Sequence, residues 1–365
     1  MFNELHKEGY ATQYAEDDPG LGAFSMRLLG FHEQPTTKYL RTFWMKAHYS
    51  NAIANVRCFH QVSFEYLKRF FSAYNKEKKF IFLNNSPVGH TEDLWQIALA
   101  DNDTYDLYQY MQNEGILENT VVMLFGDHGS RAGTFRGTLT GRLEERLPFL
   151  SLTVPEWFRT SNTMYHQHLT ANTNVLTTPF DMYATIRHLM NLNTNKTQYR
   201  FGRSLLSHID PMNRTCESAG IKSHWCPCLQ TMNINVTNSK VVDIAERVVE
   251  FMNMLLCKVT ETCDKCSSLT LKKVIKAGRR TTKKELRGFS GKRGKRTKVI
   301  YEVMFEVAPS GGLFETTVRV TFDSNENITD VNVSEQSLSR INMYRDQPKC
   351  VEKTFPHLMK YCLCK

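Results

Sequence analysis

A short apolar run followed at once by a Gly-rich polar turn is the feature of this sequence that most constrains its fold. The run Thr-Val-Val-Met-Leu-Phe at 120–125 is β-branched and apolar, and Gly-Asp-His-Gly at 126–129 follows it directly. A helical pattern over 91–114 precedes the run and ends at Gly115. The order helix, buried strand and polar turn is typical of α/β proteins, which place reactive groups at the carboxyl edge of a parallel sheet.

The same alternation of strands and helices extends over the first 208 residues. Apolar runs at 79–84 and 147–154 predict two more buried strands. Residues 178–190 predict a helix with Pro179 in its first turn. We therefore predict an α/β domain over 1–208, with a mostly parallel sheet flanked by helices.

The remaining residues, 209–365, differ from the first 208 in cysteine content and in the order of predicted helices and strands. Cys-rich loops are followed by an amphipathic helical pattern over 239–258. Alternating strand patterns at 298–307 and 316–322 then predict a hairpin or a small sheet. We predict a disulfide-rich α+β extension to the first domain.

Cysteines and glycosylation sequons indicate the secretory pathway. Nine of the ten cysteines fall from Cys216 onward, and seven Asn-x-Ser/Thr sequons occur. The sequon asparagines are Asn84, Asn102, Asn195, Asn213, Asn235, Asn327 and Asn332. Together they predict an extracellular protein with disulfides and surface glycans. The alternatives are a cytosolic protein whose sequons are never read, and a zinc site at one of the C-x-C or C-x-x-C pairs.

The amino terminus and the hydropathy bear on how the protein would enter that pathway. The first ten residues contain no apolar h-region, so they predict no signal peptide in this chain. No run of about 18 apolar residues occurs, which predicts no membrane span. Luminal chemistry without an entry signal leads us to expect that the true start is missing.

The formal net charge of +9 is concentrated in one basic strip, residues 272–298. The strip holds thirteen Lys or Arg and a single acid, Glu285, so the rest of the chain is slightly acidic. In an extracellular protein such a strip predicts binding to anionic glycans. Nucleic-acid binding is disfavoured, because Phe289 is the only aromatic residue of the strip that could stack on a base. The alternatives are a solvated loop and a cleavage site at Arg293–Arg296, which resembles a proprotein-convertase site.

Asp127 and His128 are the strongest local signal for chemistry. An adjacent carboxylate and imidazole at the end of a strand can both reach one divalent cation. Gly126 and Gly129 allow the backbone to turn tightly around such an ion. A polar turn that merely caps the strand is the alternative.

Several sequence blocks, in order, resemble a known family. The run T-V-V-M-L-F-G-D-H-G-S-R at 120–131 resembles the D-H-G element of sulfatases, nucleotide pyrophosphatases and phosphoglycerol transferases, members of the alkaline phosphatase superfamily. The match is closer to a sulfatase-like eukaryotic family of extracellular proteins with no assigned reaction. Further blocks that resemble that family lie at 9–17, 30–40, 141–150, 176–185, 201–206 and 214–228. The resemblance implies an alkaline-phosphatase-like α/β fold.

The resemblance also implies roles for particular residues. Asp127 and His128 would be ligands of one divalent metal: zinc, manganese, calcium or magnesium. His90 stands where the superfamily places an active-site His after a strand. Ser86 occupies the position at which two-zinc phosphodiesterases carry a metal-binding Asp, so a single metal is expected, with His90 contacting the substrate anion. A His satisfied within its own loop is the alternative for His90.

Three arginines follow the Asp-His pair closely. Guanidinium groups bind tetrahedral oxyanions in a bidentate way, so Arg131 or Arg136 could contact a sulfate or phosphate. The alternative is that these arginines and Arg142 pair with Glu144 and Glu145 or face solvent.

Glu16 and Asp17 follow the Gly-Tyr-x-Thr block that begins at Gly9. Sulfatases carry a Lys-x-His anion site at this place. The acids reverse the charge, so the usual sulfate-binding set is not expected here.

The resemblance places the nucleophile and further metal-binding aspartates ahead of the Gly9 block, where this chain has only eight residues. The parent reaction implied is metal-dependent hydrolysis or transfer of a sulfate or phosphate ester. For this chain we expect weak or absent metal binding and no turnover. The alternative, from a different class, is a non-catalytic extracellular binding protein.

Overall fold

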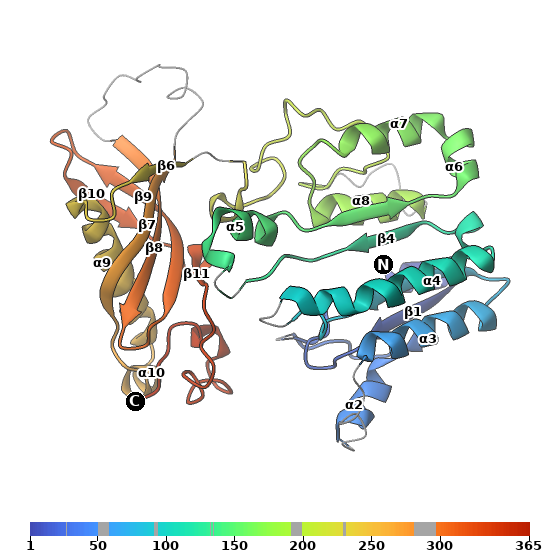
Figure 1. The fold of residues 1–365 in the computed structure, drawn as a ribbon, viewed down its shortest axis with the longest axis horizontal. Helices are drawn as coiled ribbons and strands as arrows, with labels where there is room; N and C mark the ends of the chain where they lie inside the picture. The colour runs from blue at the N-terminus through green and yellow to red at the C-terminus, as the bar shows by residue number, and fades with distance from the viewer. Residues whose placement is uncertain are drawn as a thin grey trace. The chain divides into compact units, whose positions relative to one another are not determined.

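The structure, a computed structural model, describes residues 1–26, 28–49, 58–90, 94–131, 133, 135–190, 199–228, 231–280 and 297–365 (Figure 1). The chain forms two compact units. The first unit comprises Met1–Met123, Ser151–Leu169 and Thr185–Gln198, and the second comprises Leu124–Leu150, Thr170–Ala184 and Tyr199–Lys365. The predicted domain boundary at residue 208 stays a prediction.

A three-stranded parallel sheet forms the centre of the first unit. Strand β1 (Tyr10–Glu16) lies between β2 (Lys38–Tyr39) and β3 (Lys78–Asn84). Strands β1 and β3 pair along their whole length, so both end at the same edge of the sheet. The parallel pairing confirms the predicted α/β class, and β3 confirms the strand predicted at 79–84.

Apolar residues of two helices cover this sheet. Helix α3 (Phe59–Ala73) buries Phe64 and Phe71, which cluster with Leu107 and Met111 of α4 (Asp101–Asn113). The spacing of these residues places them on one face of each helix, which is the usual reason that an amphipathic helix packs on a sheet. The stripe predicted through Leu107 and Met111 is therefore buried.

The other helical elements of the first part of the chain are short. They are α1 (Phe2–Lys7), α2 (Arg41–Tyr49), η1 (Leu94–Ala100), η2 (Ile116–Asn119), α6 (Glu156–Ser161), α7 (Thr163–Asn172) and α8 (Pro179–Leu189). Helix α8 confirms the helix predicted at 178–190. The helix predicted at 91–114 is, from Leu94 onward, a 3₁₀ segment followed by α4.

Two further strands pair in a two-stranded sheet. They are β4 (Val122–Phe125) and β5 (Leu150–Thr153). Strand β4 confirms the strand predicted at 120–125. Strand β5 is shorter than the predicted run 147–154, because Pro148 and Pro155 bracket it and cannot donate a ladder hydrogen bond.

The second unit is built on a six-stranded antiparallel sheet with the strand order β10-β9-β8-β7-β6, in which β11 also pairs with β9. The strands are β6 (Thr231–Ile234), β7 (Thr270–Arg280), β8 (Thr297–Ala308), β9 (Leu313–Phe322), β10 (Ile328–Asn332) and β11 (Leu338–Arg340). Its helical elements are η3 (Phe135–Gly137), α5 (Leu139–Arg146), η4 (Ser223–Trp225), α9 (Ser239–Leu256), α10 (Thr260–Lys265), η5 (Glu335–Ser337) and η6 (Pro356–Leu358). From residue 209 onward these elements confirm the predicted α+β class, whereas the predicted bounds of the extension stay a prediction.

One face of this sheet is apolar. Helix α9 buries Ile244, Val248 and Met252 against Phe305 of β8 and Phe314 of β9. The helix confirms the pattern predicted over 239–258. Because side chains alternate along a strand, the residues between these core positions point to the opposite face.

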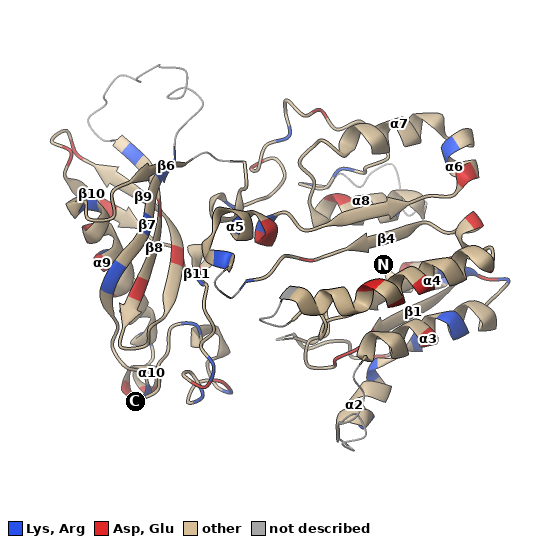
Figure 2. Cartoon of the chain, in the orientation of Figure 1, with Lys and Arg blue, Asp and Glu red and all other residues tan. Residues whose placement is uncertain are grey.

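The opposite face carries charge. Glu302 of β8 and Glu315 of β9 are buried there, and Figure 2 shows acidic and basic residues within the strands. Buried carboxylates need cations beside them.

Part of the predicted basic strip is strand rather than loop. Lys272 and Lys273 lie in β7 and pair with Glu306, whereas Arg280, at the end of β7, is buried. Residues 281–296, with the predicted cleavage site at 293–296, lie outside the described residues.

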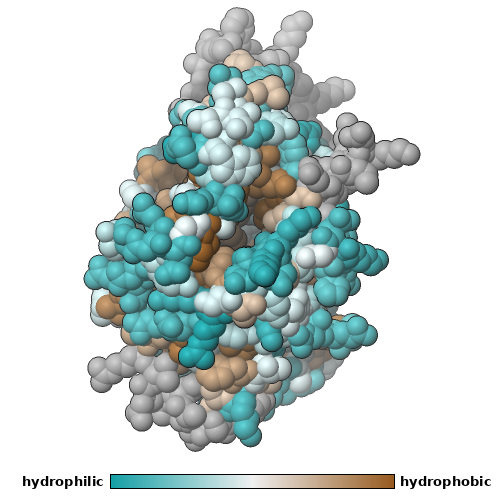
Figure 3. Space-filling view, turned by 90° about the vertical axis from the view of Figure 1, so that its right-hand side faces the viewer, coloured by the Kyte–Doolittle hydropathy of each residue, from teal (hydrophilic) through white to brown (hydrophobic). Residues whose placement is uncertain are grey.

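Figure 3 shows one face of the molecule, on which apolar side chains reach the surface between mostly polar ones.

No helix in the described part of the chain has the length and apolar character that crossing a membrane requires.

Candidate metal site

The turn that follows β4 brings Asp127 and His128 together. The Gly126 N–H donates to the carbonyl of Phe149 at 3.0 Å, which fixes the start of the turn. The Asp127 side chain is 83% exposed, and its Oδ1 accepts a hydrogen bond from the His128 backbone N–H at 2.9 Å. His128 Nε2 lies 3.4 Å from Asp127 Oδ2. The two predicted ligands are therefore neighbours at the surface.

The arrangement of the His128 ring suits a metal ligand. Nδ1 lies 2.8 Å from the carbonyl oxygen of Gly129, so in the tautomer with a proton on Nδ1 the ring donates to that carbonyl. Nε2 then presents a lone pair beside the Asp127 carboxylate. Metal-binding histidines usually hold their second ring nitrogen in this way.

The distance between the two donors matches a tetrahedral site. Ligand bonds of about 2.1 Å at tetrahedral angles place neighbouring donor atoms about 3.4 Å apart. Asp127 Oδ2 and His128 Nε2 have this separation. Within the described ranges, the groups of three or more potential ligand atoms consist only of cysteines, so the turn itself supplies two protein donors.

Gly129 seats the turn on helix α5. Its N–H donates to the carbonyl of Glu145 at 3.3 Å. A Cβ at this position would lie 2.3 Å from the carbonyl oxygen of Glu144, closer than real Cβ contacts allow. Only glycine permits this approach, which gives Gly129 a packing role that the sequence did not reveal.

The arginines after the turn have different environments. Arg131 is exposed and, among the described residues, makes no ion pair. Arg136 is buried and forms ion pairs with Glu145 and Glu315. The pairing with Glu145 is the alternative that the sequence left open for Arg136, so we assign it no contact with a substrate anion.

His90 belongs to the first unit and is exposed in the turn after β3. Its N–H donates to the carbonyl of Pro87 at 3.4 Å. Its predicted contact with a substrate anion stays a prediction.

Glu16, by contrast, is buried at the end of β1. Its Oε1 pairs with Arg41 Nη1 at 2.7 Å, and its Oε2 accepts from the Tyr14 hydroxyl at 2.6 Å. Arg41 thus compensates the negative charge of Glu16. Glu16 is one of the two acids that stand where sulfatases carry the Lys-x-His anion site.

Asp17 is buried beside Glu16 at the same sheet edge. Its Oδ1 accepts from the Ser86 N–H at 2.8 Å, whereas its Oδ2 is buried without a hydrogen-bond partner. Burial raises the pKa of this carboxyl to about 6, against the effect of the hydrogen bond from Ser86.

A family model described as "Protein of unknown function (DUF229)" matches residues 1–275, about three-quarters of the chain. This chain belongs to the DUF229 family. Comparison with curated proteins and with solved structures gave no match.

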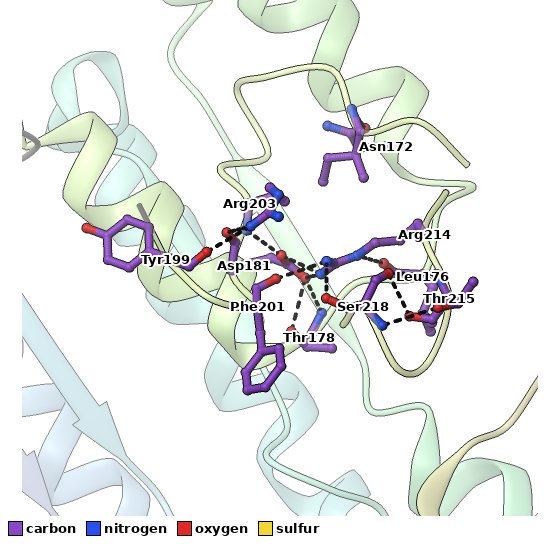
Figure 4. Close-up of polar contacts among 12 residues, drawn as sticks. Asn172, Leu176, Thr178, Asp181, Tyr199, Phe201, Arg203, Arg214, Thr215 and Ser218 are labelled. Atoms are coloured by element: carbon purple, nitrogen blue, oxygen red, sulfur yellow. Dashed lines mark hydrogen bonds and ion pairs between the residues drawn. The ribbon is translucent and has the colours of Figure 1, made fainter. Parts of the chain in front are cut away.

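The matched DUF229 region contains a buried ion pair that sequence reasoning missed (Figure 4). Asp181, at the start of α8, pairs with Arg214, and both are buried. Asp181 also accepts from Thr178 and from the Arg203 N–H, and Arg214 donates to the Phe201 carbonyl. The pair therefore joins three of the resembling blocks, 176–185, 201–206 and 214–228. The available signal was Asp181, which is the one charged residue of the block 176–185.

The DUF229 chain also carries four disulfides. They join Cys216 to Cys226, Cys257 to Cys263, Cys266 to Cys362 and Cys350 to Cys364. Cys58 and Cys228 are unpaired. The four bonds confirm the predicted disulfides, and Cys228 of the Cys226-x-Cys228 pair is not part of one. They fit a secreted protein.

Proposed function

We propose that this chain is an extracellular member of the sulfatase-like branch of the alkaline phosphatase superfamily, with a metal-binding turn at Asp127 and His128. The parent reaction is hydrolysis or transfer of a sulfate or phosphate ester. The observation that carries the proposal is the 3.4 Å separation of Asp127 Oδ2 and His128 Nε2, with the other ring nitrogen held by Gly129.

Within this proposal each residue of the turn has a separate task. Asp127 and His128 hold a divalent metal, which when bound supplies Lewis-acid stabilisation of charge on the ester oxygens. Arg131, exposed two residues after Gly129, binds a non-bridging oxygen of the ester through its guanidinium group. His90 keeps its predicted role as a contact of a substrate anion.

Two donors from one turn make weak metal binding the expected state of this chain. Structural and catalytic zinc sites usually have three or four protein ligands. We therefore propose that this chain has low affinity for metal and does not turn over substrate.

A non-catalytic binding protein is the second candidate. The burial of Arg136, and the ion pairs that Arg142 makes with Glu302 and Glu315, favour it, because these cations are used inside the fold. In this candidate the partly described basic strip 272–298 binds anionic glycans.

Metal titration tests the proposal. Isothermal titration of the intact protein with Zn²⁺ and with Mn²⁺ should show one weak site that Asp127→Ala abolishes. Asp264→Ala, which removes an exposed acid of α10, is the matched control and should bind as wild type does. Equal binding by wild type and Asp127→Ala would remove the metal site from the proposal. Release of sulfate or phosphate from an aryl ester would contradict both the proposed absence of turnover and the non-catalytic candidate.

A further inference from the structure

A buried group of charges lies behind the Asp-His turn. Three arginines converge on Glu315 of β9: Arg136 Nη1 at 3.0 Å, Arg142 Nε at 3.1 Å and Arg146 Nη2 at 2.8 Å. The Glu315 side chain is 4% exposed. The Glu315 carboxylate therefore forms ion pairs with one arginine of η3 and with two arginines of α5.

The sheet presents this carboxylate because of strand alternation. Phe314 and Val318 of β9 face α9 and the apolar core, so Glu315 points to the other side. On α5, Arg142 and Arg146 are four residues apart and share one helix face. That face is the one that meets the sheet.

Two more glutamates complete the group. Glu302 of β8 pairs with Arg142 at 2.6 Å and with Arg280 at 2.5 Å. Glu145 of α5 pairs with Arg136. The group thus holds four arginines and three glutamates, an excess of one positive charge.

The arginines keep the strand carboxylates ionised. Burial opposes ionisation of Glu302, but Arg142 and Arg280 outweigh it and lower its pKa to about 2. Burial likewise opposes ionisation of Glu315, and the neighbouring arginines lower its pKa too. Removal of one partner leaves charge buried without compensation, so the group has one strongly preferred arrangement.

Helix α5 transmits this arrangement to the turn. Gly129 lies against the backbone of Glu144 and Glu145, with no room for a Cβ. The Gly129 carbonyl in turn lies 2.8 Å from His128 Nδ1. A shift of α5 therefore displaces the group that orients the His128 ring.

We propose that Glu315 is a positioning residue for the Asp127–His128 pair, acting through α5 and Gly129. In this proposal, residues 209–365 contribute to the position of the Asp127–His128 pair. The expected change in metal affinity rests on the proposed function. The expected change in the order of the turn does not, because it is measured without metal.

Two variants disturb the path at different points. Glu315→Gln removes the central carboxylate charge. Gly129→Ala leaves the ion pairs in place and pushes the turn away from α5. The matched controls are Glu306→Gln, which removes a carboxylate paired with exposed lysines, and Gly137→Ala, whose Cβ would meet nothing within 4 Å.

Two measurements on the intact protein are needed. Hydrogen exchange followed by mass spectrometry, on a peptide covering 124–131, reports the order of the turn without metal. Calorimetric titration with Zn²⁺ measures the affinity of the Asp127–His128 pair for metal. We expect both variants to exchange several-fold faster over 124–131, and their metal affinity to fall roughly tenfold, as for loss of an outer partner of a metal ligand.

Each outcome decides the inference. If Glu315→Gln unfolds the protein, Gly129→Ala and its control decide the matter. Wild-type exchange over 124–131 in a folded Glu315→Gln protein would overturn it, whatever Gly129→Ala does. Wild-type exchange and affinity in Gly129→Ala would also overturn it. If wild type binds no metal, the proposed function falls, and the exchange measurement still decides whether Glu315 and Gly129 position the turn.

Discussion

Arg214 donates from Nη2 to both carboxylate oxygens of Asp181, each at 2.6 Å, in a region where both side chains are buried. Arg214 also donates to the backbone carbonyls of Leu176 and Phe201. The charges are thus compensated and most of their hydrogen-bonding groups are used. A buried pair with this many bonds fixes the relative positions of three chain segments.

Asp181→Asn should strongly destabilise the protein. The variant leaves the Arg214 charge buried without a counter-ion, which typically costs about 3–5 kcal/mol. Guanidinium unfolding monitored by circular dichroism measures the loss. Asp243→Asn is the control, since its exposed pair with Arg247 should be worth about 0.5 kcal/mol or less. Similar losses in the two variants would show that the buried pair is not a stabilising contact.

Because Asp17 is buried, we expect the free energy of unfolding to fall as the pH rises. Burial raises the pKa of this carboxyl from 3.8 to about 6, so the folded protein binds the proton more tightly than the unfolded chain does. Its contribution is therefore fully present below pH 3.8 and is lost as the pH rises through about 6. Asp17→Asn should remove a pH-dependent loss on the order of 2 kcal/mol between pH 4 and 7. Urea unfolding of both proteins at several pH values measures it.

The control for Asp17 is Asp106→Asn, which changes an exposed acid of α4. Its stability should follow the wild-type pH profile. If Asp17→Asn also follows that profile, the Asp17 carboxyl is ionised in the folded protein with little penalty, contrary to its burial.

The burial of His224 should make stability fall as the pH decreases, opposite to the effect of Asp17. Burial lowers the pKa of this imidazole from 6.5 to about 3, and its two nitrogens lie 2.9 Å from Thr317 Oγ1 and 3.1 Å from Ser339 Oγ. The unfolded chain binds the proton more tightly, so the contribution is present above pH 6.5 and is lost as the pH falls toward 3. His224→Gln should remove a loss on the order of 2 kcal/mol between pH 6.5 and 4.5.

Acid unfolding followed by tryptophan fluorescence checks this slope, with the exposed His357→Gln as control. The His224→Gln protein should need a lower pH to unfold, relative to its own stability at pH 7, than either wild type or the control. An unchanged midpoint would mean that the ring becomes protonated without leaving its position.

The strand and turn at 120–129 could be predicted from sequence because their signal is local. An apolar β-branched run and the glycines of the turn determine their conformation with little help from the rest of the chain. The same holds for α9, whose apolar spacing is regular over the whole helix.

The environments of the arginines could not be predicted in this way. Arg131 and Arg136 are five residues apart and chemically identical, yet one is exposed and the other is buried. Their difference depends on Glu315, which lies far along the chain and reaches Arg136 only after the antiparallel sheet has formed. Local patterns do not carry that information. The burial of Asp17 depends on pairing with β3 for the same reason.

The disulfide between Cys266 and Cys362 should contribute more stability than the one between Cys257 and Cys263. It links residues 96 apart in sequence, against 6 for the other, and both of its cysteines are buried. If disulfides act mainly by restricting the unfolded chain, the expected contributions are about 4–5 and about 2 kcal/mol. Guanidinium unfolding of the two double Cys→Ser variants measures both, with each variant's remaining disulfides verified by mass spectrometry. Equal losses, or a larger loss for Cys257 and Cys263, would mean that contacts of the folded state rather than chain restriction determine what these bonds contribute.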